Sequence, residues 1–449
     1  MAMVVDDLQL PSGAFDPLVP SDLVADELRQ LEESGHDVSD LVRKANQLDP
    51  GDAGALLAFH DGLAFSPVSP GWIYREPNSL AAIEAAWPGP PTLQAVASHS
   101  EEHRLAGAWF GRIAGCIAGK PVEQGDHWTP MHIKAYLKAA GAWPLTGYVP
   151  LLDPMPEEFV LRACWPESTL GNISGAARDD DIDYTILGLS LLEKHREALT
   201  TTDVGRGWLT GFPILQLFTA ERAAYRNLIA GVPPEATALV RNPYREWIGA
   251  QIRADIFGYV FPGDPARAAR LAWQDARLSH VGNGIYGEMW AAALVSLAFV
   301  SATASEAFER SLAYVPAESR LHEALTMTRT IKLAGATWEE AIQEAHGRLG
   351  HYRWVHTVNN AALVAIGLLW GEDDYALSVG RTVMGGWDTD SNGATVGSVL
   401  GALHGHTSIP DHFTLPLRDE VRSAVFGHGV ERITSLVDRS LALRVALRS

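Results

Sequence analysis

Residues 103–119 read HRLAGAWFGRIAGCIAG, and glycine recurs at positions 107, 111, 115 and 119. Helical residues four apart lie on one face, so this stretch predicts a helix with a groove that is free of side chains. Residues 393–405 repeat the spacing, with glycines at 393, 397, 401 and 405. Each glycine costs a helix roughly 1 kcal/mol relative to alanine, so two such rows indicate close packing of another backbone or a site built against the helix. A membrane dimer face is excluded, because Arg112 and polar ends interrupt the apolar run.

The chain beyond residue 95 has a mainly helical pattern. Helical periodicity recurs in YTILGLSLLEKHREAL, GEMWAAALVSLAFV and AALVAIGLLWG, whereas strand-like alternation is scarce. We therefore predict an all-α fold, with residues 96–449 as the main domain. Residues 1–95 differ, because an acidic and locally helical segment leads into a stretch of proline, glycine and aromatic residues that ends in AAWPGPPT. They are predicted to form a helical N-terminal extension.

The composition is that of a globular and strongly acidic protein. The 449 residues are 47% apolar, and 54 acidic against 35 basic residues give a formal net charge of −19. This charge argues against binding to nucleic acid or to an anionic membrane surface, and it suits a protein that depends on cations. Only two cysteines occur, Cys116 and Cys164, so neither a disulfide framework nor a thiolate zinc site is indicated. A reducing cytoplasm is the expected location.

Neither a secretion signal nor a membrane span is expected. The first residues, MAMVVDDLQL, lack a basic region followed by an apolar core. The most apolar stretch, residues 289–300, is too short to cross a bilayer and directly follows Glu288. We predict that it forms a buried core helix.

Four carboxylates open an apolar helical run in residues 178–189, RDDDIDYTILGL: Asp179, Asp180, Asp181 and Asp183. Aspartate is a good helix cap, and acids in a first turn are favoured by roughly 0.3–1 kcal/mol each through the helix dipole. Capping accounts for one or two of them. Three adjacent acids exceed that need, and a bound cation would offset their mutual repulsion. A cation site is therefore favoured over simple capping.

A second acidic cluster lies in residues 383–397, VMGGWDTDSNGATVG, where Asp388 and Asp390 follow a Gly-Gly turn and precede the second row of glycines. Carboxylates at alternate positions, together with the hydroxyls of Thr389 and Ser391, offer the short oxygen ligands that Mg²⁺ prefers. No glutamate follows at the distance that an EF-hand loop requires, and a turn with a helix cap is the plainer alternative. Two such clusters, each opening a helix, predict convergence on one dinuclear cation site.

Taken together and in order, these segments resemble the ADP-ribosylglycohydrolase family. The glycine-rich first helix of that family and its G-x-P-x-E element are matched by GRIAGCIAGKPVE, which ends at Glu123. Its Ser/Thr-Asp-Asp-Thr motif aligns with residues 179–182, and its late G-G-D-T-D-T/S-N motif with GGWDTDSN, in which Trp387 is inserted. GAQIRADIFG and LSHVGNGIYG resemble two intermediate segments, the second of which gives His280. The resemblance runs from about residue 105 to residue 408.

The resemblance implies an orthogonal all-α helical bundle with two Mg²⁺ ions, or Mn²⁺ in their place, at its centre. It implies hydrolysis of the bond from C1″ of an ADP-ribosyl ribose to a nitrogen or oxygen atom of a protein or small molecule, with release of ADP-ribose. Position by position, the implied metal ligands are Asp179, Asp180, Asp181, Asp388, Asp390 and Ser391. Glu123 would contact the metal or position the attacking water, and Asp181 would share in catalysis. Ions that grip the ribose would stabilise the charge that develops at C1″.

Several positions depart from the family's pattern. Cys116 stands where an aspartate is frequent, so a polar role there is lost. Asp179 replaces a hydroxyl and Ile182 replaces a threonine, which should raise the negative charge of the site and shift its metal preference. Asp255 stands where proline is common, and the sequence offers no functional account of it.

Residues 280–284 are a candidate for substrate binding. His280 would hydrogen-bond the diphosphate or the ribose, while Gly282, Asn283 and Gly284 would let the backbone come close. A purely structural role for the histidine is an equal alternative.

Three other functions compete with this hypothesis. Asp179, Asp180 and Asp183 also satisfy the D-D-x-x-D motif of class I terpene synthases, but the second acidic motif of those enzymes is missing. A catalytically silent protein that binds ADP-ribose and a ribosidase that acts on a free nucleoside or nucleotide both remain open. In the expected function, the partner is an ADP-ribosylated protein or small molecule.

Overall fold

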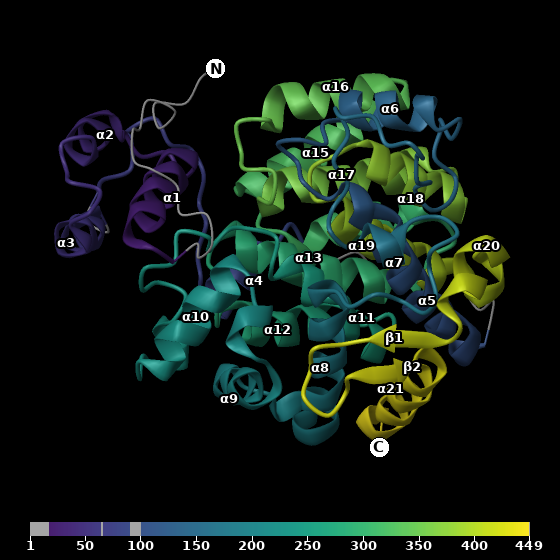
Figure 1. Ribbon diagram of the computed structural model, residues 1–449. Coiled ribbons are helices and arrows are strands. Elements are labelled where there is room, and N and C mark those ends of the chain that lie inside the picture. Colours follow the sequence, from purple (N-terminus) through teal and green to yellow (C-terminus); the bar gives the residue numbers. More distant parts are fainter. Residues whose placement is uncertain (1–17, 64–65, 90–99, 449) are drawn as a thin grey trace.

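The computed structural model describes residues 18–63, 66–89 and 100–448, and Figure 1 shows their arrangement. The predicted all-α fold is confirmed, because these residues form 21 α-helices and one sheet of two short strands. The α-helices are α1 (Pro20–Glu33), α2 (Ser39–Ala45), α3 (Ala53–Leu63), α4 (Leu80–Ala85), α5 (Glu101–Gly119), α6 (Pro130–Ala139), α7 (Trp165–Ser168), α8 (Asp180–His195), α9 (Thr201–Gly211), α10 (Thr219–Ile229), α11 (Asp255–Val260), α12 (Pro265–Ala276), α13 (Asn283–Ala298), α14 (Ala304–Ser311), α15 (Arg320–Leu333), α16 (Trp338–Leu349), α17 (Thr357–Trp370), α18 (Tyr375–Met384), α19 (Thr389–His404), α20 (Asp411–Thr414) and α21 (Ile433–Arg448). The strands are β1 (Glu420–Arg422) and β2 (Val430–Arg432), and the 3₁₀ helices are η2 (Lys120–Val122), η3 (Arg196–Ala198), η4 (Ile214–Gln216), η5 (Pro234–Ala236), η6 (Gln251–Arg253), η7 (Leu312–Tyr314), η8 (His406–Ser408) and η9 (Leu415–Leu417).

Helices α5 and α19 make the most extensive helix–helix contact in the described part of the chain. Their glycine rows face each other in antiparallel pairs: Gly107 with Gly401, Gly111 with Gly397, and Gly115 with Gly393. A Cβ atom added at any of these positions would lie closer than 3.0 Å to a backbone oxygen of the other helix. The two helices therefore approach at backbone distance, and any side chain between them would force them apart.

The centre of the main domain consists of helices that are buried on all sides. Every residue of α13 and every residue of α17 is buried. The segment predicted to be a buried core helix, residues 289–300, forms the second half of α13 and the two residues that follow it. Helix α13 packs against α11, α12 and α14, and it also contacts α17 and α19. This core fixes the ends of the helices from which the site is built.

Helices α1–α3 lie to one side of the main domain (Figure 1, purple). They enclose a small apolar core of their own: Val24, Leu28, Leu31, Val38, Val42, Ala45, Leu56 and Leu63. Helix α4 differs, because its Ile83 belongs to the core of the main domain. The boundary that we predicted between residues 95 and 96 lies outside the described residues and stays a prediction.

Buried polar contacts fasten α1 to the main domain. Arg245 forms an ion pair with Glu27 at 2.7 Å, and Gln30 Nε2 donates to Glu246 Oε2 at 2.7 Å. Arg320 Nη2 lies 2.7 Å from Glu246 Oε2 and also 2.7 Å from Glu76 Oε2. The extension and the main domain therefore share one network of charges.

The C-terminal segment contains the small sheet that the sequence did not predict. Strands β1 and β2 pair antiparallel, with Glu420 opposite Arg432. Each strand has three residues, which is too few for the alternation that identifies strands in a sequence. Within the described residues, no helix is long and apolar enough to cross a membrane.

Candidate functional site

Three helix ends meet at the acidic residues. Helix α5 ends at Gly119, α8 begins after its cap Asp179, and α19 begins after its cap Asp388. The Asp179 carboxylate accepts a hydrogen bond of 3.0 Å from the Asp181 backbone N–H, as an N-cap residue does. Because α5 and α19 run antiparallel, the C-terminus of one helix lies beside the N-terminus of the other.

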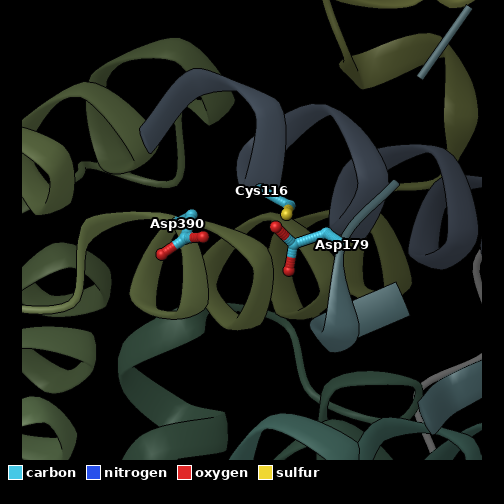
Figure 2. Close-up of side chains that lie close together, drawn as sticks. All are labelled: Cys116, Asp179 and Asp390. Atoms are coloured by element: carbon cyan, nitrogen blue, oxygen red, sulfur yellow. The ribbon is translucent and has the colours of Figure 1, made fainter. Parts of the chain in front are cut away.

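The structure brings the two acidic clusters together. Their ligand atoms form three groups within which all atoms lie no more than 4.8 Å apart: Asp179 with Asp180 and Asp181, Glu123 with Asp388 and Asp390, and Cys116 with Asp179 and Asp390. Figure 2 shows the third group, in which the Cys116 sulfur and the Asp179 carboxylate point toward each other. Glu123, which follows η2, thus lies beside residues more than 260 positions away in the chain.

The pKa values of most of these acids are raised. Burial raises the pKa of Asp181 and of Asp388 well above the usual range, and neighbouring carboxylates add to the effect. Burial and the charge of Asp179 raise the pKa of Asp180 to about 8. Asp179 is the exception: burial would raise its pKa too, but the ammonium of Lys120 outweighs that effect and holds it below its usual value. Without further positive charge, the cluster is electrostatically unfavourable as a set of ionised acids.

The donor set fits a hard divalent cation. It consists of aspartate and glutamate oxygens together with the Ser391 hydroxyl, which donates to Asp181 Oδ2 at 3.2 Å. The other oxygen of that carboxylate, Asp181 Oδ1, is buried, receives no hydrogen bond from the described residues, and has the guanidinium of Arg112 at 3.7 Å. A buried carboxylate oxygen without a donor is costly, and a cation would satisfy it.

Asp183 lies apart from this cluster. Its carboxylate accepts from Arg178 Nε at 2.7 Å and from the Ala424 backbone N–H at 2.9 Å. It does not line the cavity that contains its three acidic neighbours. In the D-D-x-x-D pattern, the last carboxylate, on Asp183, therefore does not lie with those of Asp179 and Asp180.

Arg112 is a positioning residue that the sequence analysis did not assign. Its fully buried guanidinium donates to the Asp181 backbone oxygen at 2.8 Å and to Thr185 Oγ1 at 3.0 Å, and it forms an ion pair of 2.9 Å with Asp255. This pair accounts for Asp255, for which the sequence offered no explanation. The only available signal was a charged residue inside a helix that is otherwise apolar.

Asn360 supports the second acidic loop from α17. Its Oδ1 accepts from the Asp388 backbone N–H at 3.2 Å and from Asn392 Nδ2 at 2.7 Å. Its Nδ2 donates to the Trp354 backbone oxygen at 2.8 Å. One buried amide therefore holds both the acidic loop and a neighbouring wall of the site.

A cavity of about 380 Å³ opens above the acidic cluster. Its acidic floor faces a wall of apolar and aromatic side chains: Phe218, Trp247, Ile248, Ile252, Trp354 and Val355. Four basic residues also line it: Lys120, Arg162, Arg178 and Arg353. Volume and lining are in the range of sites for small molecules.

The predicted substrate-binding residues 280–284 are not brought to this cavity. His280 is fully buried, and its Nδ1 lies 2.8 Å from Ser279 Oγ. Asn283 Nδ2 donates to Glu246 Oε1 at 2.9 Å, within the network that fastens α1. The Gly282 backbone N–H donates to Asn78 at 2.7 Å, and Gly284 packs against the backbone of Arg245. Contact of these residues with a substrate stays a prediction.

The chain is similar to proteins of one known family. The family model described as ADP-ribosylglycohydrolase matches residues 97–448. One solved structure that is similar to the chain is described as an ADP-ribosylglycohydrolase-related protein complex, with 17% identity, a TM-score of 0.47, and coverage of 77% of this chain and 99% of that one. No curated protein matches the sequence. Because the family model spans well over half of its length, the chain belongs to the ADP-ribosylglycohydrolase family.

Proposed function

We propose that the protein is a hydrolase that depends on divalent cations and cleaves the C1″ bond between ADP-ribose and a nitrogen or oxygen atom of its substrate. The family suggests an activity of the glycohydrolase type and ADP-ribosylated substrates. The observation that carries the proposal is the buried acidic cluster, which lines a cavity together with cationic side chains. Within the described residues, Asp181 Oδ1 receives no hydrogen bond and lies 3.7 Å from Arg112 Nη2. The substrate would be an ADP-ribosylated protein or small molecule.

The proposed cation ligands are those expected from the sequence: Asp179, Asp180, Asp181, Asp388, Asp390 and Ser391. When bound by these residues, Mg²⁺ or Mn²⁺ would supply positive charge to polarise substrate oxygens and to orient the ribose. Glu123 lies next to Asp388 and Asp390, where it can accept a proton from the attacking water. Asp181 has its own backbone fixed by Arg112, so its carboxylate is held in place during the reaction.

The other walls of the cavity suit the adenine, riboses and diphosphate of ADP-ribose. Trp247, Phe218 and Trp354 offer apolar faces on which an adenine or a ribose can pack. Arg353 offers positive charge for a diphosphate, because its nearest carboxylate oxygen, on Asp26, lies 3.7 Å away and its Nε has no hydrogen-bond partner among the described residues. A location in the cytoplasm and independence from nucleic acid are part of the proposal and rest on the composition.

Hydrolysis of ADP-ribosyl-arginine, ADP-ribosyl-serine and O-acetyl-ADP-ribose tests the proposal, each measured with and without EDTA. We expect release of ADP-ribose from at least one of them, and we expect its loss on chelation. The double variant Asp388→Asn with Asp390→Asn should abolish it, whereas Asp438→Asn, on the exposed side of α21, should not. Activity that survives EDTA or the double substitution would refute the cation mechanism. Turnover of a free nucleoside alone would favour a ribosidase instead.

A further inference from the structure

Lys120 places a positive charge inside the acidic cluster. It is the first residue of η2 and directly follows the last glycine of α5. Its Nζ forms an ion pair and a hydrogen bond with Asp179 Oδ2, and its side chain is only 11% exposed. The backbone at this point is fixed by the close contact of Gly119 with the start of α19. The ammonium therefore belongs to the cluster and not to the surface.

The surroundings of this ammonium are one of the three groups of candidate ligands. Lys120 lies four residues after Cys116, so both side chains leave the same face of the chain. The charges of Asp179 and Asp390 both act on Lys120, and these two residues form the group with Cys116 that Figure 2 shows. A lysine ammonium donates three hydrogen bonds and carries a positive charge, which is what a cluster of carboxylates requires.

Two of the three groups share Asp179, whose Oδ2 the ammonium already occupies. The remaining group, which consists of Glu123, Asp388 and Asp390, does not contain Asp179. Among the described residues, Arg162 is the basic residue that forms an ion pair with this group: its Nη2 lies 3.4 Å from Glu123 Oε2. Arg162 is 39% exposed, so it can turn toward solvent. A divalent ion that used Asp179 Oδ2 would have to displace the ammonium of Lys120, whereas an ion at Glu123, Asp388 and Asp390 would meet three carboxylates and, beside Glu123, the more exposed guanidinium of Arg162.

We propose that Lys120 is a built-in cation that takes the place of one of the two divalent ions expected from the sequence. This narrows the set of ligands proposed above: Asp179 pairs with Lys120 and not with a metal, and the protein binds a single exchangeable ion at Glu123, Asp388 and Asp390. This rests on the proposed cation-dependent function. The acidic residue at position 179, where the family usually has a hydroxyl, then acts as the counter-ion of Lys120. The negative charge of Asp179 and the positive charge of Lys120 compensate each other.

Binding of Mn²⁺ to the full chain, without substrate, tests this proposal. Isothermal titration calorimetry gives the number of ions per chain, and electron paramagnetic resonance distinguishes an isolated Mn²⁺ ion from an exchange-coupled pair. We expect one ion with the spectrum of an isolated centre in the wild type. Lys120→Met should bind two ions and show the coupled spectrum. Lys120→Gln, which keeps a hydrogen-bond donor for Asp179, is the second variant in case the first does not fold, and Lys138→Met, at an exposed lysine of α6, is the control that should bind one.

Two ions in the wild type would overturn the proposal, and so would a single ion in a folded Lys120→Met or Lys120→Gln protein. Failure of the proposed function is a separate outcome, because the count of ions is read without any substrate. A protein that binds one Mn²⁺ ion but releases no ADP-ribose would refute the function and leave the role of Lys120 intact.

Discussion

Substitution of Gly397 by alanine tests the packing on which the site depends. The added Cβ atom would lie closer than 3.0 Å to the Gly111 backbone oxygen, whereas ordinary contact begins at 3.4 Å. It would also crowd the Tyr375 hydroxyl, which donates to that same oxygen at 2.7 Å. A backbone oxygen within a helix cannot turn aside, so α5 and α19 would have to separate. Such overpacking costs roughly 1–3 kcal/mol or more, which exceeds the gain of about 1 kcal/mol in helix propensity.

Gly347→Ala is the matched control for this substitution. Gly347 lies in α16, is exposed, and has no atom of the described residues within 4 Å of an added Cβ. At this position only the higher helix propensity of alanine matters, because the added methyl group is not crowded. We expect a gain of roughly 1 kcal/mol in the free energy of unfolding. Differential scanning calorimetry should therefore show a lower melting temperature for Gly397→Ala and a higher one for Gly347→Ala. If both variants were stabilised, the inference that the glycine rows are closed to side chains would be wrong.

Three further predictions concern stability and the support of the site. Burial raises the pKa of Glu33 from 4.5 to about 8, so the folded protein keeps a proton that the unfolded chain releases above pH 4.5. The free energy of unfolding therefore falls as the pH rises toward 8. Glu33→Gln should raise the melting temperature at pH 8 and change it little at pH 4. Asn360→Ala removes the acceptor of the Asp388 N–H, which should cost roughly 1–3 kcal/mol and weaken Mn²⁺ binding in a calorimetric titration. Arg112→Met leaves a buried carboxylate without its partner and frees the Asp181 backbone, so the melting temperature should fall by an amount equivalent to about 3–5 kcal/mol, and an unchanged melting curve would contradict this account.

The helical fold could be predicted because its signals are local. Periodicity identified the helices, and the spacing of glycines indicated that a backbone would approach each row. The sequence did not predict that the two rows of glycines contact each other, because glycine has no side chain whose size or charge would indicate a partner. The small sheet escaped prediction for a different reason, since three-residue strands carry too little pattern.

The meeting of the two acidic clusters could also be predicted from the sequence, because each cluster opens a helix and a shared cation would offset the repulsion of its carboxylates. The residues that support them could not be predicted. Each is a single polar residue whose role depends on a partner distant in the sequence. Arg112 pairs with a residue 143 positions away and Lys120 with one 59 positions away, and Asn360 supports a loop 28 residues later. The position of residues 280–284 likewise depends on contacts with the N-terminal extension.

The polar contacts of α1 also determine how far this protein can be trimmed. The residues that the family model matches begin at 97, yet Glu246 and Arg320 inside that range take partners from Gln30 and Glu76 outside it. A chain that began at residue 97 would keep the charges of Glu246 and Arg320 but lose those partners. It would also lose Glu33, whose carboxylate accepts a hydrogen bond from the Arg353 backbone N–H. Arg353 itself lines the cavity. We therefore expect the smallest unit that folds on its own to be longer than the segment that the family model matches.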